Sequence, residues 1–205
     1  EWGLNWCIAT TAHQFHIIHA AVVAKGDRCA LIPGRPGAGK STLCAALVAS
    51  GWRLFSDEMA LISLADGRIW PVPRPISLKN ASIEIIQTRF PQTHFGPVVS
   101  DTHKGTVTHM RAPRDSVQQA GQPASAAWVI FPKYSPDAEL SVTAVSPCHA
   151  TLRLADNSFN LPLLGAAGFH TLADAVMPCA AFDFTYSRLD DAITWFDGLG
   201  TGDAP

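Results

Sequence analysis

The residues from 34 to 42 have the types and the spacing needed to hold a chain of phosphates. They match the pattern G-x-x-x-x-G-K-[ST], in which backbone amides, a lysine and a hydroxyl bind a triphosphate and its magnesium ion. The alternative is a glycine-rich turn without a ligand, which leaves the order of strand, loop, Lys-Ser pair and helix unexplained. We therefore predict a nucleotide-binding loop for ATP and Mg²⁺, made of Gly34, Arg35, Pro36, Gly37, Ala38, Gly39, Lys40, Ser41 and Thr42.

Two adjacent carboxylates, Asp57 and Glu58, follow this loop at the end of an apolar run. One carboxylate beside a triphosphate can hold magnesium, and the other can accept the proton of an attacking hydroxyl. We predict Asp57 as the general base and Lys40 as the catalytic cation on the β/γ oxygens. The predicted metal ligands are Ser41, Glu58 and Asp57. The two carboxylates can exchange these roles, and a solvated acidic strand end is the alternative.

The elements around these residues are those that such a site requires. Residues 29–32 form a short apolar run that predicts a strand into the loop, and residues 43–49 predict a helix after it. Residues 52–56 predict the strand that delivers the acidic pair. A long strand over residues 13–24 turns at residues 25–28 into the strand before the loop. This antiparallel hairpin is informative, because common mononucleotide-binding folds reach such a loop from a parallel sheet.

The rest of the chain is less informative about chemistry. The pair Asp66-Gly67 predicts a hairpin turn, and residues 81–89 a helix. Residues 90–123 are polar and rich in Pro and Gly, which predicts a long lid, a binding segment or partial disorder. Lys104 and Arg111 in this segment are candidate ligands for the γ-phosphate or the acceptor. The alternative for both is a mobile, solvated basic loop.

Composition limits the function classes. The chain has 205 residues, 47% hydrophobic and 16% charged, so we expect one globular domain over residues 1–205. The net charge of −2 and the lack of a basic run argue against a nucleic-acid partner. No apolar run approaches the length of a membrane span. Five widely spaced cysteines favour reduced thiols and a cytoplasmic location. The chain begins without Met, so we expect an upstream segment.

The spacing of three separate features resembles the catalytic domain of the HPr kinase/phosphorylase family. His19 lies fifteen residues before Gly34, as the family's histidine does, and the glycine-rich loop follows. Residues 51–58 read G-W-R-L-F-S-D-E and are similar to the family's G-H-R-L-V-x-D-D. The resemblance implies an α/β fold with a mixed sheet and flanking helices, like that of phosphoenolpyruvate carboxykinase. The activity that it implies is transfer of phosphate from ATP to a hydroxyl, such as that of a protein serine. The resemblance also places His19 near the active site, for which the alternative is an ordinary strand histidine without a catalytic role. It further implies homo-oligomers.

The later part of the chain resembles the HPr-kinase-related (type A) group. Residues 103–109, 158–160, 165–169 and 186–190 carry this likeness. The family's E-x-R-G segment, whose glutamate helps to bind metal, corresponds by spacing to residues 77–80, which contain no acid. This difference leaves nucleotide binding intact but keeps a second function open, an ATP-binding regulatory NTPase without an acceptor. The acceptor itself, a protein serine or a small molecule, cannot be named from the residues.

Overall fold

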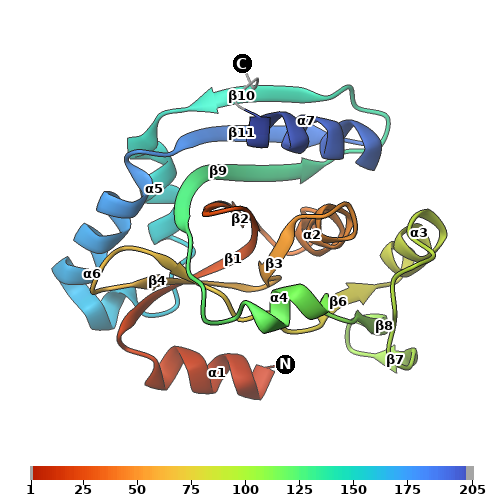
Figure 1. The fold of residues 1–205 in the computed structure, drawn as a ribbon, viewed down its shortest axis with the longest axis horizontal. Coiled ribbons are helices and arrows are strands. Elements are labelled where there is room, and N and C mark those ends of the chain that lie inside the picture. Colours follow the sequence, from red (N-terminus) through yellow and green to blue (C-terminus); the bar gives the residue numbers. More distant parts are fainter. Residues whose placement is uncertain (1, 202–205) are drawn as a thin grey trace.

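The computed structural model describes residues 2–201, and a mixed sheet with helices on both faces forms its centre (Figure 1). The strands of this sheet are β1 (Phe15–Lys25), β2 (Arg28–Pro33), β3 (Arg53–Ser56), β4 (Met59–Ser63), β5 (Ile69–Trp70), β9 (Ser125–Tyr134), β10 (Ser141–Val145) and β11 (Ala180–Tyr186). Their order is β10-β11-β9-β2-β1-β4-β5, and β3 also pairs with β1.

The predicted hairpin and the predicted mixed sheet are both confirmed. β1 and β2 pair antiparallel from Ala20↔Pro33 to Lys25↔Arg28, whereas β2 pairs parallel with β9 and β9 with β11. The turn between β1 and β2 has Gly26 at φ 60°, a backbone conformation that glycine adopts without steric cost. The hairpin predicted at Asp66-Gly67 is also present and joins β4 to β5.

The central strands are buried on both faces, which explains their continuous apolar sequence. The helices are α2 (Lys40–Ala49) and α7 (Leu189–Thr201) on one face, and α5 (Pro147–Ala155) and α6 (Leu161–Val176) on the other (Figure 1). Along β1, Ala21 and Val23 pack with α2 and α7, while Ala20 and Val22 pack with α5 and α6. This alternation fixes the position of α2, and thereby of the loop that precedes it.

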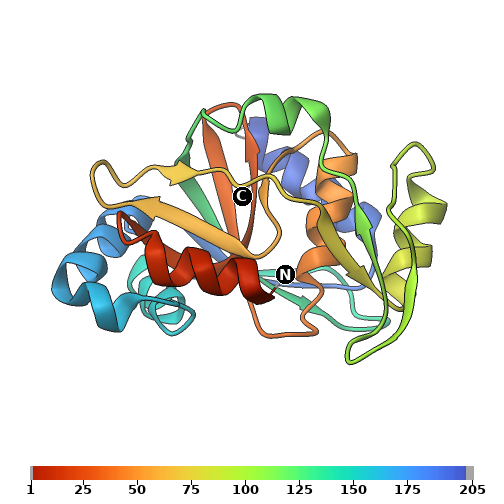
Figure 2. The ribbon, with the colours of Figure 1, turned by 90° about the horizontal axis from the view of Figure 1, so that it is seen from below.

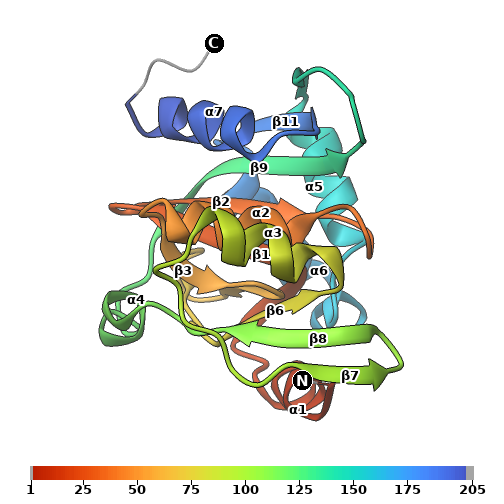
Figure 3. The ribbon, with the colours of Figure 1, turned by 90° about the vertical axis from the view of Figure 1, so that its right-hand side faces the viewer.

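The prediction of a long loop over residues 90–123 is wrong in part. The segment contains β7 (Val99–Thr102), β8 (Gly105–Met110) and α4 (Arg114–Gln118). With β6 (Ile76–Lys79) the two strands form a second, smaller sheet in the order β6-β8-β7, and α3 (Ala81–Arg89) follows β6 as predicted. Figure 3 shows the β7–β8 hairpin below the main sheet. Its strands are short and partly exposed, so no apolar alternation marks them in the sequence.

Besides α4, two helices were not predicted, α1 (Trp2–Thr11) and α5. α1 lies across one side of the main sheet (Figure 2). Ile8 and Ala12 pack there against a small cluster of Ile17, Met59 and Leu61. Because α1 has only one narrow contact stripe, its sequence carries little helical periodicity, and tertiary contacts stabilise it. None of the described helices is both long and apolar enough to cross a bilayer.

Candidate active site

The glycine-rich loop (residues 34–39) connects β2 to α2, so its position is fixed by the sheet at one end and the helix at the other. Gly37 and Gly39 have φ of 85° and 91°, in the left-handed region that favours glycine. Two tyrosines hold the loop from outside. The Tyr134 amide donates to the Ala38 carbonyl at 3.2 Å, and the Tyr186 hydroxyl donates to the Gly39 carbonyl at 3.3 Å. The loop is therefore shaped before any ligand binds.

Lys40 is the first residue of α2 and is only 8% exposed. Its ammonium donates to the carbonyls of Gly34 and Arg35 and so folds back over the loop. Burial lowers the pKa of Lys40; Glu58 opposes this effect, and the positive charge of Lys79 adds to it. Because the negative charge of Glu58 does not offset the burial of the Lys40 ammonium, this cation is suited to an anionic ligand.

The acidic pair forms the connection between β3 and β4. Both strands pair with β1, and the Ser56 hydroxyl accepts hydrogen bonds from the amides of Glu58 (3.2 Å) and Met59 (3.0 Å). The Ala20 amide also donates to the Glu58 carbonyl at 3.2 Å. These bonds make a tight turn inside the sheet, and both carboxylates line one cavity with the start of α2 and the glycine-rich loop.

The two carboxylates have different surroundings. Asp57 is 8% exposed, and its Oδ2 accepts a hydrogen bond from the Ser77 amide at 3.0 Å. Glu58 Oε2 accepts a hydrogen bond from the side-chain amide of Asn5 at 2.6 Å and lies 3.9 Å from the Arg74 guanidinium. Asp57 is thus bound to the second sheet, whereas Glu58 is bound to α1 and the segment before β6.

A cavity of about 380 Å³, here called the loop cavity, brings most of the predicted residues together. The glycine-rich loop and the start of α2 form one wall, and β6, α3 and the β7–β8 turn form the opposite one. The predicted residues in its lining are His19, Pro36, Gly37, Gly39, Lys40, Ser41, Thr42, Asp57, Glu58 and Lys104. Gly34, Arg35 and Ala38 belong to the loop but do not line the cavity.

Arg111 lies elsewhere. It is exposed and lines a different pocket, where its amide donates to the His94 carbonyl at 2.7 Å. Lys104, by contrast, is brought to the loop cavity by the β7–β8 turn, and the Asn80 side chain fixes this turn by accepting from the Thr106 amide at 3.1 Å. Of the two candidate residues in the segment 90–123, only Lys104 is within the same cavity as the loop.

His19 lies on β1 opposite Met59, beside the acidic turn. Its ring stacks on Phe159 with centroids 5.6 Å apart, and it lines the loop cavity. Burial lowers its pKa first, the charge of Lys40 lowers it further, and Glu58 opposes both. The imidazole is consequently neutral near pH 7 and able to accept a hydrogen bond.

Three lining residues were not identified from the sequence as site residues: Ser77 and Lys79 of β6, and Ser82 of α3. Ser77 and Lys79 belong to the segment that carries no acid, and the structure brings a cation and a hydroxyl to the cavity instead. The Ser77 hydroxyl oxygen is buried without a hydrogen-bond partner among the described residues. A buried hydroxyl of this kind is costly unless a ligand or water satisfies it.

The oxygen donors at the cavity fit a hard divalent cation. A Ser41 hydroxyl with the Asp57 and Glu58 carboxylates is the kind of set that Mg²⁺ accepts, since this ion usually takes few protein ligands and completes its shell with phosphates and water. No cluster of three or more His, Cys, Asp or Glu side chains within residues 2–201 could hold a metal by itself. Ser41, Asp57 and Glu58 would hold such an ion together with phosphate oxygens and water.

Comparisons with known proteins add little to this geometry. No protein-family model matches the chain, and no curated protein is similar to it. Among solved structures, the Hpr(Ser) kinase/phosphatase from Coxiella burnetii is similar at 11% sequence identity and a TM-score of 0.37. The match covers 91% of this chain and 92% of that chain. At this level of likeness, the residues of the loop cavity and not this match support the function considered next.

Proposed function

We propose that the protein is an ATP-dependent phosphotransferase that transfers the γ-phosphoryl group to a hydroxyl acceptor. One observation carries the proposal: two separate segments of the chain place Lys40, Ser41, Asp57 and Glu58 around one cavity. A triphosphate loop alone would indicate only nucleotide binding. A carboxylate pair in the same cavity adds the groups needed for proton transfer and for a metal ion.

The phosphate chain lies along the start of α2 in this proposal. The amides of residues 37–41 and the positive end of the helix dipole bind the β-phosphate. Lys40 exchanges its two loop carbonyls for β/γ oxygens, which are better partners for an ammonium ion. Lys79 and Lys104, on the opposite wall, face the γ-phosphate and compensate the charge that develops on it.

Asp57 acts on the acceptor. Its carboxylate takes the proton of the acceptor hydroxyl as the new O–P bond forms and the bond from the γ-phosphorus to the β–γ bridging oxygen breaks, so that ADP leaves with the electron pair. Ser41 and Glu58 would hold Mg²⁺, which would supply positive charge to neutralise the β/γ oxygens. The resemblance to HPr kinases favours a protein serine as acceptor, and a small-molecule alcohol is the other class that the same chemistry serves.

The test combines nucleotide binding with transfer. Wild type, Lys40→Ala, Asp57→Asn and the surface control Asp66→Asn are each titrated with Mg-ATP and then incubated with γ-labelled ATP and a lysate of the source cells. We expect Asp57→Asn to bind ATP and to lose about 10²–10⁴-fold in transfer. Lys40→Ala should lose both binding and transfer, and the control neither.

Each outcome has a definite meaning. Label on one acceptor that depends on Asp57 supports the kinase. ADP release without an acceptor supports the regulatory NTPase instead. The absence of ATP binding by the wild-type protein, or normal transfer by Asp57→Asn, contradicts the proposal.

A further inference from the structure

A second and larger cavity borders the glycine-rich loop on its other side. Its volume is about 980 Å³, and we call it the tyrosine cavity. It shares Gly37, Gly39, Thr42 and Ser82 with the loop cavity, so the two spaces meet at the loop. Its remaining walls come from α3, from the end of β9 and from the junction of β11 with α7. The size is at the upper end of the range for small-molecule sites.

We propose that the tyrosine cavity binds the base and ribose of the nucleoside triphosphate whose phosphates occupy the loop cavity, with Tyr134 as the stacking surface for the base. The inference rests on the proposed function, because it needs a triphosphate at the loop. It adds a site for the part of the nucleotide that the glycine-rich loop itself does not contact.

Tyr134 has the exposure and the support expected of a stacking surface. Its side chain is 49% exposed, whereas its neighbour Tyr186 is 1% exposed, and their ring centroids are 5.8 Å apart. The Tyr134 amide is bonded to the Ala38 carbonyl, so the ring is anchored at the loop. A half-exposed aromatic face that is held rigidly beside a phosphate site favours a planar, uncharged group.

The opposite wall also offers apolar surface. Ile85 of α3 is 45% exposed and lines the same cavity, as does Leu189 at the start of α7. Ile85 is left incompletely covered by the protein itself, whereas Leu189 is partly buried against the core. A base packed against Ile85 would remove it from water.

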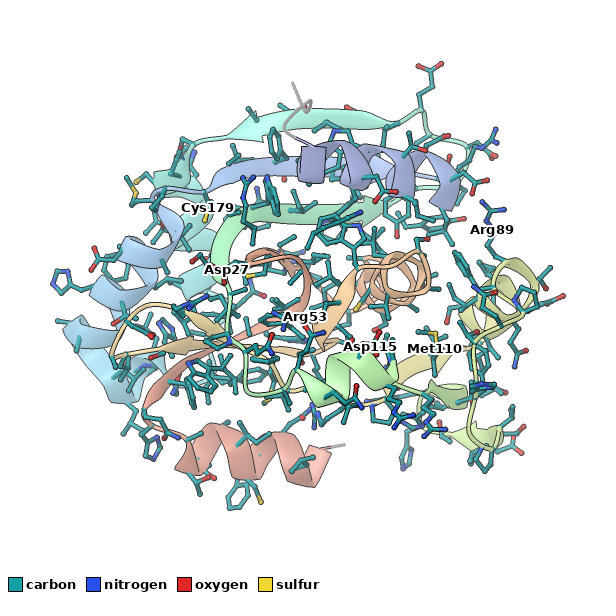
Figure 4. The ribbon with its side chains drawn as sticks, viewed as in Figure 1. Asp27, Arg53, Arg89, Met110, Asp115 and Cys179 are labelled. Carbon is teal, nitrogen blue, oxygen red and sulfur yellow. The ribbon has the colours of Figure 1, made fainter. Side chains whose placement is uncertain are left out.

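The charges separate the two cavities. Three lysines and two carboxylates, Asp57 and Glu58, line the loop cavity, which leaves an excess of one positive charge for phosphates. In the tyrosine cavity Arg89 and Arg188 are balanced by Glu84 and Asp190, and Arg89 is ion-paired with Asp190. Figure 4 shows Arg89 extending from α3 toward α7. An uncharged nucleoside with several hydrogen-bonding groups fits this balanced lining better than a second phosphate group would.

The test compares ATP with inorganic tripolyphosphate, which has the phosphates but no nucleoside. Both are titrated in the presence of Mg²⁺ against wild type, Tyr134→Ala, Tyr134→Phe and Ile85→Ala. Leu152→Ala, which removes an equally exposed apolar side chain from α5, is the matched control. We expect Tyr134→Ala to weaken ATP binding by about 5- to 100-fold and to leave tripolyphosphate binding unchanged. Tyr134→Phe should stay within about two-fold of wild type, because it keeps the aromatic face.

The outcomes separate the two proposals. Unchanged ATP affinity in both Tyr134→Ala and Ile85→Ala overturns the nucleoside site while leaving the phosphate site intact. Equal losses for ATP and tripolyphosphate in Tyr134→Ala also overturn it, because they would assign Tyr134 to loop packing alone. A wild-type protein that binds neither compound contradicts the proposed function itself.

Discussion

Replacement of Lys40 by methionine tests whether the buried ammonium serves a ligand or the fold. In the ligand-free protein this ammonium donates to the carbonyls of Gly34 and Arg35. Charged hydrogen bonds contribute roughly 1.5–3 kcal/mol each, but burial lowers the pKa of Lys40 and so opposes its charge. Methionine has a similar length and is apolar. We therefore expect the free energy of unfolding of Lys40→Met to stay within about 2 kcal/mol of wild type.

The effect on ligand binding is much larger. At a Mg-ATP concentration of about 100 Kd, the wild-type protein gains roughly 2.7 kcal/mol, which for a chain of this size raises Tm by about 5–10 °C. Loss of the lysine contact to phosphate costs about 3 kcal/mol, or roughly a hundred-fold in Kd. At the same ATP concentration the variant is then about half saturated, and its Tm rises by only about 1 °C.

The assay is thermal unfolding with and without Mg-ATP, followed by circular dichroism. Lys25→Met is the matched control, because Lys25 pairs with Asp197 at 2.9 Å, away from the cavity. This control should keep the full shift. A shift of 5 °C or more in Lys40→Met would refute the reasoning, and so would a ligand-free variant that is unfolded at 25 °C.

Three further changes follow from the same structure. His16 is fully buried, and burial lowers its pKa below 6.5. As pH falls below about 6.5 the unfolded chain therefore takes up the proton first, and the wild-type protein loses stability. The Tm of His16→Gln should decline less than that of wild type between pH 7 and pH 5, and equal slopes would contradict this. A Cβ at Gly39 would lie 2.6 Å from the Tyr186 hydroxyl, whereas a Cβ at Gly51, which also has a positive φ, would meet open space. Gly39→Ala should therefore lower the free energy of unfolding by about 1–3 kcal/mol more than Gly51→Ala does. Similar urea midpoints for the two variants would exclude the clash. Asn5→Ala removes the side-chain amide that donates to Glu58. Steady-state kinetics and titration should show a kcat reduced roughly ten-fold with little change in ATP affinity. An unchanged kcat would show that α1 has no positioning role.

The part of the site that was predictable from the sequence is the part encoded by neighbouring residues. The glycine-rich loop lies between one strand and one helix, and both were recognisable from apolar pattern and helix propensity. The turn at Asp57 is also local, because β3 and β4 pair with the same strand. His19 was placed near the loop only through the family resemblance, since a position on a strand gives no information about distant neighbours in the chain.

The opposite wall of the loop cavity was not predictable in the same way. β6, β7 and β8 are short, and pairing such as Ser77↔His109 joins segments far apart in the chain. Ile76 and Leu78 of β6 pack into the core, and Ser77 and Lys79, which alternate with them, carried no signal of their own. Lys104 and Arg111 were both candidates, and the position of the β7–β8 turn brings Lys104 alone of the two to the loop cavity.

Asp57 connects the two walls. Asp57 lies in the turn after β3 of the main sheet, and its carboxylate accepts a hydrogen bond from the Ser77 backbone amide of the smaller sheet at 3.0 Å. Removal of the acceptor would leave a buried amide unpaired and would free β6 to move, so Asp57→Ala would change the shape of the cavity together with its chemistry. Asn keeps an acceptor oxygen at the same position and removes only the charge and the basicity. A loss of transfer in Asp57→Asn with intact ATP binding would therefore be a loss of proton transfer and not of architecture.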